Sequence, residues 1–256
     1  MAKKNSESTQ PWLLFLLSAI LLSAGWLMKS FPIFIFFGFA PLFAIADQAK
    51  VNDDFWINTE FILLTLFTAF FAAFIFNSSH LIGAIIHAIV FTLAFLAYSF
   101  AYRNLGNNLG KFILIFFWLG LEYALLKLPW RNEVIFLADA VILKKDWLNW
   151  TTYTGYLGST LWILCTNLLL YMTIFKGKWS ILCLVLTLLA LLGPVVISYF
   201  ISVHAVNRGE MITLYTQGNS MTTSYSKQGE LIPRTAAWIS VLILLIAFVK
   251  TQTKKK

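Results

Sequence analysis

Eight apolar stretches, most of them close to the length that crosses a bilayer, constrain the fold of this chain more than any other feature. A helix that spans the hydrocarbon core needs about 20 mostly apolar residues, and its backbone polar groups must be satisfied within the segment. We therefore expect an all-α protein, a polytopic integral membrane bundle of about eight transmembrane helices. The predicted spans are residues 12–28, 31–47, 57–77, 81–101, 112–127, 150–175, 179–203 and 235–250.

The composition excludes an ordinary soluble domain. Apolar residues make up 59% of the 256 residues and charged residues 12%, whereas soluble domains carry about 25% charged residues. Little sequence remains for a water-soluble core, so we expect one membrane domain. It divides into a cytoplasmic tail (1–10), a seven-helix membrane region (11–203), a short periplasmic loop (204–233) and a final helix with a basic tail (234–256).

The basic residues predict the orientation of the bundle. The net charge is +8, and the lysines and arginines gather at the ends of the apolar stretches, for example at Lys3, Lys4 and Lys254. Short cytoplasmic connections are enriched in Lys and Arg, which favours an orientation with both termini in the cytoplasm. No basic face with interleaved aromatic residues lies outside the predicted spans, so we expect no nucleic-acid partner.

The cysteines and histidines predict neither a metal site nor a cofactor. Cys165 and Cys183 lie inside apolar stretches, where a thiol stays protonated and is a poor nucleophile. His80 and His87 are seven residues apart on one predicted helix, whereas helical metal pairs use a spacing of three or four. We interpret His87 as a hydrogen-bonded interior residue and His80 as an interfacial one.

Four segments carry a pattern beyond hydrophobicity, and they lie at residues 32–47, 118–130, 149–167 and 221–236. They contain, in order, a "PL" pair, a "W…E…PW" stretch, a "YTG…G…W…N" stretch and a "Y…GE.I.R" stretch. The positions that form these patterns are Pro41, Leu42, Trp118, Glu122, Pro129, Trp130, Tyr153, Thr154, Gly155, Gly158, Trp162, Asn167, Tyr225, Gly229, Glu230, Ile232 and Arg234.

On these residues the chain resembles the apolipoprotein N-acyltransferases, especially forms from Bacteroidetes-type bacteria. The resemblance implies a multi-pass protein of the bacterial inner membrane that contacts phospholipid and lipoprotein acyl chains. Members of the family move an acyl chain from a phospholipid to the amino group of a lipoprotein cysteine. They use a Cys nucleophile, a Glu and a Lys in a nitrilase-like domain between the seventh and eighth spans.

The interval between the last two apolar stretches departs from that family. Residues 204–233 number about thirty, whereas an independent domain needs roughly 50–250 residues. They include Glu210, Lys227 and Glu230 but no cysteine. Acyl-enzyme chemistry needs an activated nucleophile, a base and oxyanion donors held together. We therefore assign no catalytic residue.

The hypothesis that follows is a lipid-binding or lipoprotein-binding pseudoenzyme, or a partner subunit of an envelope complex. One alternative is an active N-acyltransferase whose catalytic domain is a separate chain or whose reaction uses a different site. Another is a structural anchor in a secretion or motility complex. All three imply other membrane or periplasmic subunits as partners.

The candidate lipid and loop residues have competing interpretations. Glu122 is an intramembrane carboxylate, a type usually functional, but we favour a structural role in which Lys127, Arg131 or a tryptophan donor pairs with it and holds the following loop. Gly155 and Gly158 permit close helix contact or a passage for an acyl chain between helices.

The remaining candidates lie in the sixth stretch and around it. Asn167 is expected to bond across to another span, and Trp162 belongs to the same motif. Residues 128–149, including Pro129 and Trp130, fit an amphipathic segment resting on the outer leaflet. Tyr153 and Arg234 complete the candidates.

Overall fold

The computed structural model describes residues 10–28, 30–51, 55–75, 80–106, 111–176, 181–201 and 229–253. Within these ranges the chain is helical and contains no strand. The longer helices are α1 (Pro11–Leu27), α2 (Ile35–Val51), α3 (Phe55–Phe74), α4 (His80–Leu105), α5 (Phe112–Leu126), α7 (Gly158–Ile174), α8 (Ile181–Phe200) and α11 (Leu231–Thr253). Shorter pieces are α6 (Thr151–Thr154) and the 3-10 turns η1 (Pro32–Phe34), η3 (Arg131–Glu133), η4 (Leu137–Val141) and η5 (Lys145–Trp147).

The predicted all-α class is confirmed, and each of the eight apolar stretches contains one longer helix. Four helical segments, α3, Leu81–Leu105 of α4, α8 and α11, are long and apolar enough to cross a membrane. The other four apolar helices have 10–17 residues. That all eight cross the bilayer, with both termini inside the cell, stays a prediction.

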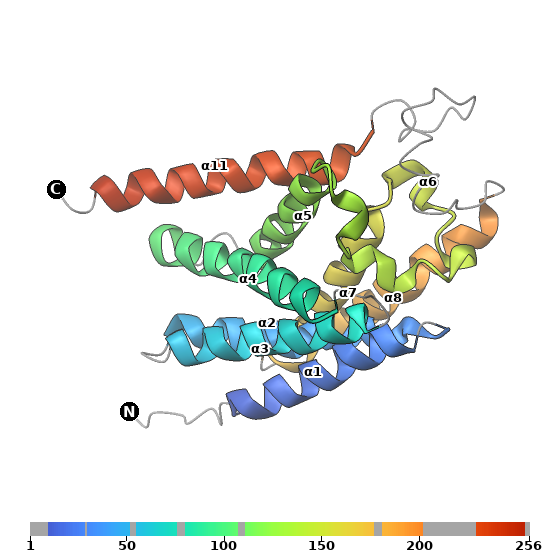
Figure 1. The fold of residues 1–256 in the computed structure, drawn as a ribbon, viewed down its shortest axis with the longest axis horizontal. Coiled ribbons are helices and arrows are strands. Elements are labelled where there is room, and N and C mark those ends of the chain that lie inside the picture. Colours follow the sequence, from blue (N-terminus) through green and yellow to red (C-terminus); the bar gives the residue numbers. More distant parts are fainter. Residues whose placement is uncertain are drawn as a thin grey trace.

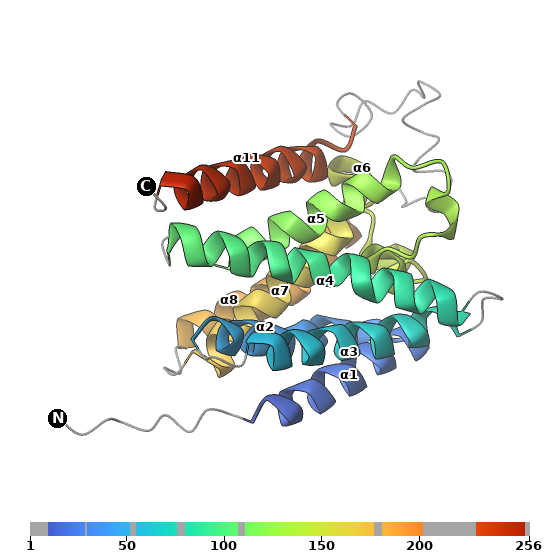
Figure 2. The same ribbon diagram turned by 60° about the vertical axis from the view of Figure 1, so that its left-hand side comes forward.

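Helices α2, α3, α4 and α11 run roughly along one direction, and α5, α7 and α8 are inclined to them (Figures 1 and 2). Helix α1 packs on α2 and α3, α3 packs on α4, and α5 lies between α4 and α11. Helix α7 packs on α2 and carries α8 on its other side. The start of α1 and the end of α11 lie at one end, which we call the terminal end. Residues 127–157 lie at the opposite end, the loop end.

The sixth stretch does not form one continuous helix, so the span predicted at 150–175 is wrong in its first turns. The short helix α6 ends at Gly155, whose φ of 87° lies in the left-handed region, and α7 begins at Gly158. A left-handed residue ends a helix, and glycine adopts this conformation without a steric penalty. The sixth long helix is therefore 17 residues long.

An aromatic layer fills the middle of the bundle. Trp118 of α5 is 1% exposed and stacks on Phe91 of α4, with ring centroids 4.3 Å apart. Phe39 of α2 and Phe95 of α4 meet the indole edge-on, at 5.1 and 6.3 Å. Edge-to-face and offset contacts of this kind add about 0.5–1.5 kcal/mol per pair beyond burial.

Candidate functional site at the loop end

The connection between α5 and α6 folds into the bundle. Its central residues are buried, including Phe136 (0% exposed) and Val141 (0% exposed). The prediction that residues 128–149 rest on the outer leaflet is therefore wrong for residues 134–141. The exposed parts of the connection are its flanks, with Trp130 at 55% and Leu143 at 62%.

Three consecutive backbone N–H groups explain why this loop can be buried. The N–H of Ile135 donates to His87 Nε2 at 3.1 Å, that of Phe136 to Asp139 Oδ2 at 2.8 Å, and that of Leu137 to Glu122 Oε1 at 2.8 Å. A buried loop must satisfy its backbone, because an unpaired N–H away from water costs about as much as a lost hydrogen bond. We call these three acceptors, from α4, η4 and α5, the loop anchors.

Glu122 is fully buried, at 0% exposure. Besides Leu137, its Oε1 accepts the indole N–H of Trp118, one turn earlier in α5, at 3.1 Å. The tryptophan donor and the loop-holding role that we favoured are confirmed. The expected partner Lys127 instead forms an ion pair with Glu230 at the start of α11, with Lys127 Nζ 2.9 Å from Glu230 Oε2.

The second carboxylate oxygen of Glu122 retains hydrogen-bonding capacity. Among the described residues, neither Glu122 Oε2 nor the buried Thr160 Oγ1 has a hydrogen-bond partner. Thr160, in the first turn of α7, lies beside the carboxylate but outside hydrogen-bonding geometry. Buried polar atoms without a partner are uncommon, and Glu122 Oε2 and Thr160 Oγ1 are two of the five such side-chain atoms among the described residues.

Asp139 joins the loop to the segment before α7. In addition to Phe136 N–H, the carboxylate accepts the phenolic hydroxyl of Tyr156. The Tyr156 ring also meets Phe136 edge-on, with centroids 6.1 Å apart. Sequence reasoning missed this contact, although a lone aspartate inside an apolar segment is a signal that it has a partner.

His87 is interior and hydrogen-bonded, as predicted. It is 8% exposed, its Nδ1 lies 2.8 Å from the Gly83 carbonyl oxygen, and Phe70 and Phe74 of α3 flank its ring at 5.2 and 4.8 Å. The side chain of His80 lies outside the described residues. Across the described ranges, no group of three His, Cys, Asp or Glu side chains could hold a metal ion.

A groove of about 200 Å³ lies beside the loop anchors. Apolar side chains of α3, α4 and α5 form most of its wall, and residues 130, 133 and 134 of the loop close one side. Its ionisable lining residues are His87 and Glu133. Because the lining residues Ile82 and Ile86 are 65% and 53% exposed, the groove opens onto the outer surface of α4.

A second groove, of about 330 Å³, lies between α1, α2 and α7. Its lining residues, such as Leu21, Phe37 and Leu170, are apolar. The connection between α1 and α2 contributes Ile33 and Phe34 to it, and none of its lining residues is ionisable. It resembles any lipid-facing furrow between helices, so it has no feature that would select a ligand.

The two motif glycines form a turn rather than a helix interface. A Cβ on Gly158 would lie 2.3 Å from Thr154 Oγ1 and 3.2 Å from Trp150 Cζ3. Gly155 supplies the left-handed turn before it. The space beside Gly158 is thus filled by α6, which supports local packing and leaves no room there for an acyl chain.

Trp162 and Asn167 satisfy backbone groups next to helix prolines. Pro194 in α8 has no N–H to offer the carbonyl four residues earlier, and that carbonyl, Ala190 O, accepts the Trp162 indole N–H at 2.7 Å. The predicted bond of Asn167 to another span is confirmed. Its amide group contacts the backbone of α2 just before Pro41, with Oδ1 accepting from Phe39 and Ala40 N–H and Nδ2 donating to Ile35 O.

The other candidates lie on the surface of the loop end. Pro129 and Arg234 are exposed, and Trp130 and Tyr153 are 55% and 47% exposed. Glu122 and Trp130 belong to one region, whereas Trp162 and Asn167 act at helix contacts. Tyr225 lies outside the described residues.

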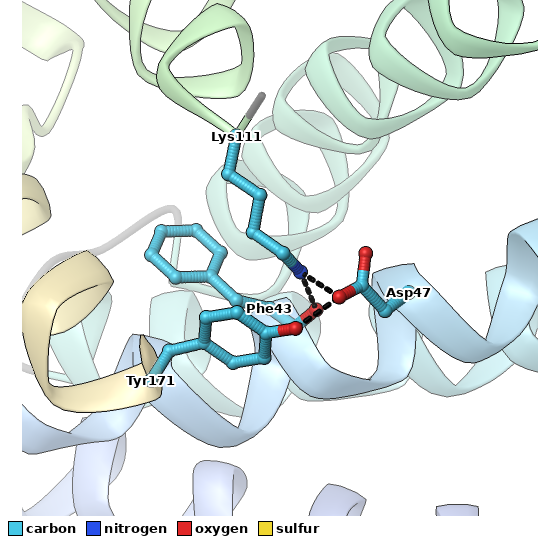
Figure 3. Close-up of polar contacts among 4 residues, drawn as sticks. All are labelled: Phe43, Asp47, Lys111 and Tyr171. Atoms are coloured by element: carbon cyan, nitrogen blue, oxygen red, sulfur yellow. Dashed lines mark hydrogen bonds and ion pairs between the residues drawn. The ribbon is translucent and has the colours of Figure 1, made fainter. Parts of the chain in front are cut away.

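A second polar cluster, which the sequence did not reveal, lies at the terminal end (Figure 3). Lys111, just before α5, places its Nζ 2.6 Å from Asp47 Oδ2 and donates to Phe43 O at 2.8 Å. The Tyr171 hydroxyl donates to the same Asp47 oxygen, and Lys111 Nζ lies 3.7 Å above the centre of the Tyr171 ring. We call these four residues the lysine cluster.

No protein-family model, no curated protein and no solved structure matches this chain. The resemblance to apolipoprotein N-acyltransferases therefore rests on the sequence motifs alone. The structure gives several of those motif residues local roles, at Glu122, Gly158, Trp162 and Asn167.

Proposed function

We propose that this chain is a multi-pass protein of the bacterial inner membrane that binds an acyl chain of a phospholipid or lipoprotein in the groove at the loop end. On this proposal the loop end faces the periplasm, and the chain transfers no acyl group by itself. The observation that carries the proposal is the groove formed by α4 and the anchored loop.

The groove has the chemistry of an acyl-chain site. Its wall is largely apolar and opens toward the surface of α4, where lipid would surround the bundle. The exposed Trp130 stands on its rim, and tryptophan prefers the headgroup level of a bilayer. In water, each buried methylene contributes about 0.8 kcal/mol to binding. Inside a bilayer the acyl chain is already surrounded by hydrocarbon, so binding there depends on van der Waals contact with a groove of matching shape.

The absence of a transfer step is supported by the placement of the thiols and by chain length. Cys165 and Cys183 lie inside α7 and α8 and are half-buried among apolar neighbours. A thiol in such surroundings is a poor nucleophile. About thirty residues connect α8 to α11, fewer than the roughly 50 that the smallest independent domains need.

A second candidate function is a membrane subunit in a larger envelope complex, and the outer helices favour it. In their most apolar windows, 11% of α8 and 22% of α11 are buried within the chain, against 44% for α3 and for α4. Partner helices could cover the exposed faces. The two functions are compatible, since a subunit can also hold a lipid.

Photo-crosslinking tests the lipid proposal. The protein is placed in nanodiscs that contain a phospholipid with a photoreactive group on its acyl chain, and crosslinked residues are mapped by mass spectrometry. Crosslinks should concentrate on groove residues of α4, such as Ile86 and Val90, above the level on α8.

A matched pair of variants provides the control. Ile86 lines the groove and Ile89, three residues further along α4, does not, although they are 53% and 52% exposed. Ile86→Trp should reduce groove crosslinking several-fold by filling the space, and Ile89→Trp should leave it unchanged. Crosslinks spread evenly over all lipid-facing helices would contradict the proposal.

A further inference from the structure

His87 ties the loop to α4 through hydrogen bonds that only one protonation state can make. The Gly83 carbonyl can only accept, so Nδ1 carries a hydrogen. The N–H of Ile135 can only donate, so Nε2 presents a lone pair. The contacts thus fix His87 as a neutral imidazole protonated on Nδ1.

We propose that protonation of His87 releases residues 130–135 of the loop from α4 and opens the groove. An imidazolium donates from both nitrogens. A second hydrogen on Nε2 would face the N–H of Ile135, and two donors cannot bond to each other. The contact is therefore present when the imidazole is neutral and is lost as the pH falls through its titration.

The aromatic rings of α3 and α4 that surround His87 offer no acceptor for a second ring hydrogen. The α3 residues against it are Phe70 and Phe74, which do not titrate. On its own helix it meets the Gly83 carbonyl, which Nδ1 already occupies, and the ring of Phe91.

The other acidic groups of this region are Glu133 in the loop and Glu122 on α5. Glu133 lines the same groove and is exposed. Glu122, on α5, is committed to Trp118 and to Leu137 N–H. Of the residues that line the groove with His87, Glu133 is the one that carries a negative charge.

The other anchors confine the movement. Phe136 and Leu137 keep their acceptors on Asp139 and Glu122, so the loop stays attached beyond residue 135. Residues 130, 133 and 134, which close one side of the groove, lie on the freed side. This release of the loop involves only residues of the protein, so it does not depend on which ligand the groove binds.

Hydrogen exchange at residue 135 tests this release of the loop in the full chain in nanodiscs. Exchange is measured at about pH 7.5 and about pH 4.5, so that the lower value lies well below the ordinary imidazole titration. The protection factor corrects each rate for the intrinsic effect of pH. Protection of Ile135 should fall about tenfold at the lower pH, as expected for the loss of one hydrogen bond, while Leu137 stays protected.

His87→Gln is the matched variant, because its side-chain oxygen can accept from Ile135 but does not titrate. Protection at Ile135 should then be independent of pH. An equal fall in native protein and variant, or no fall in native protein, would overturn the proposal.

A spectroscopic measurement keeps the proposal testable if that variant does not fold. Nitrogen-15 histidine spectra of a His80→Gln/His204→Gln protein report His87 alone, because the chain has three histidines. The Nδ1–H tautomer should be seen at neutral pH and the imidazolium at low pH. An Nε2–H tautomer at neutral pH would contradict it.

Discussion

The two polar clusters of the molecule hold their carboxylates in different ways. In the lysine cluster, Asp47 faces the cation of Lys111, and its side chain is 34% exposed. At the loop end, fully buried Glu122 accepts from neutral donors, an indole and a backbone N–H. The contacts of the lysine cluster therefore join helices to one another. The contacts of Glu122 exist only while the loop lies inside the bundle.

This difference places the adjustable part of the protein at the loop end. Near the bundle surface, water and dissolved salt weaken the attraction between the two charges of an ion pair. A buried acceptor that holds a loop couples helix packing to loop position, because losing either partner leaves a buried group unpaired. The groove lies beside the second kind of contact.

The largest expected effect comes from Glu122→Leu. This change leaves the Trp118 and Leu137 N–H groups buried without an acceptor, and each such group costs about 1–3 kcal/mol. We expect a loss of about 3 kcal/mol in the free energy of unfolding in mixed micelles, with faster hydrogen exchange at residues 135–137. Glu122→Gln keeps an acceptor oxygen and should lose much less. Equal losses for both variants would mean that Glu122 does not hold the loop.

Lys111→Met should cost less than Glu122→Leu, although it removes a charge. The Asp47 side chain that remains is partly exposed and keeps the Tyr171 hydroxyl, so we expect about 1.5 kcal/mol, discounted for solvent screening. Unfolding in the same micelles measures it, and Lys111→Met/Asp47→Asn should recover part of the loss. A cost above that of Glu122→Leu would reverse the comparison.

Trp162→Phe should cost about 1 kcal/mol, the value of one hydrogen bond. It removes the donor to Ala190 O, the carbonyl that Pro194 leaves free. Pro194→Ala restores the helix N–H, so the double variant should recover stability that Trp162→Phe alone loses. If the two changes are additive, the tryptophan does not compensate for the proline.

The smallest effect is a difference between two tyrosines, each 4% exposed and each donating to an aspartate. Asp47 retains Lys111 when Tyr171→Phe removes the hydroxyl. Asp139 retains the Phe136 N–H after Tyr156→Phe. We expect Tyr156→Phe to cost about 0.5 kcal/mol more, because the donor that remains on Asp139 is a neutral N–H, whereas the donor that remains on Asp47 is a cation. Equal costs would weaken the comparison.

The helices could be predicted from the sequence, because the hydropathy of a stretch is determined by residues that are adjacent in the chain. The stretch 112–127, for example, matches α5 at Phe112–Leu126. The break at Gly155 was missed because the predicted span continued through it, although residues 151–160 are rich in Thr, Ser and Gly.

Two of the loop anchors, His87 and Glu122, could not be predicted in the same way, because they are distant in sequence from the N–H groups that donate to them. His87 lies 48 residues from Ile135, and Glu122 lies 15 residues from Leu137. The composition of residues 128–149, which combines charged and apolar side chains, predicts a segment at the membrane surface. Such a segment can be buried only when acceptors elsewhere in the fold satisfy its backbone N–H groups. Glu122 was recognisable as a partnered carboxylate, but not the backbone N–H that it holds.

We propose that the anchored loop forms one wall of a groove that binds an acyl chain. A structure of the purified protein in lipid nanodiscs, determined by electron cryomicroscopy with a bound antibody fragment, would show both the loop and the lipid. We expect residues 134–141 inside the bundle and elongated lipid density between α4 and residues 130–134. A loop lying on the membrane surface, or a groove closed by protein side chains, would contradict it.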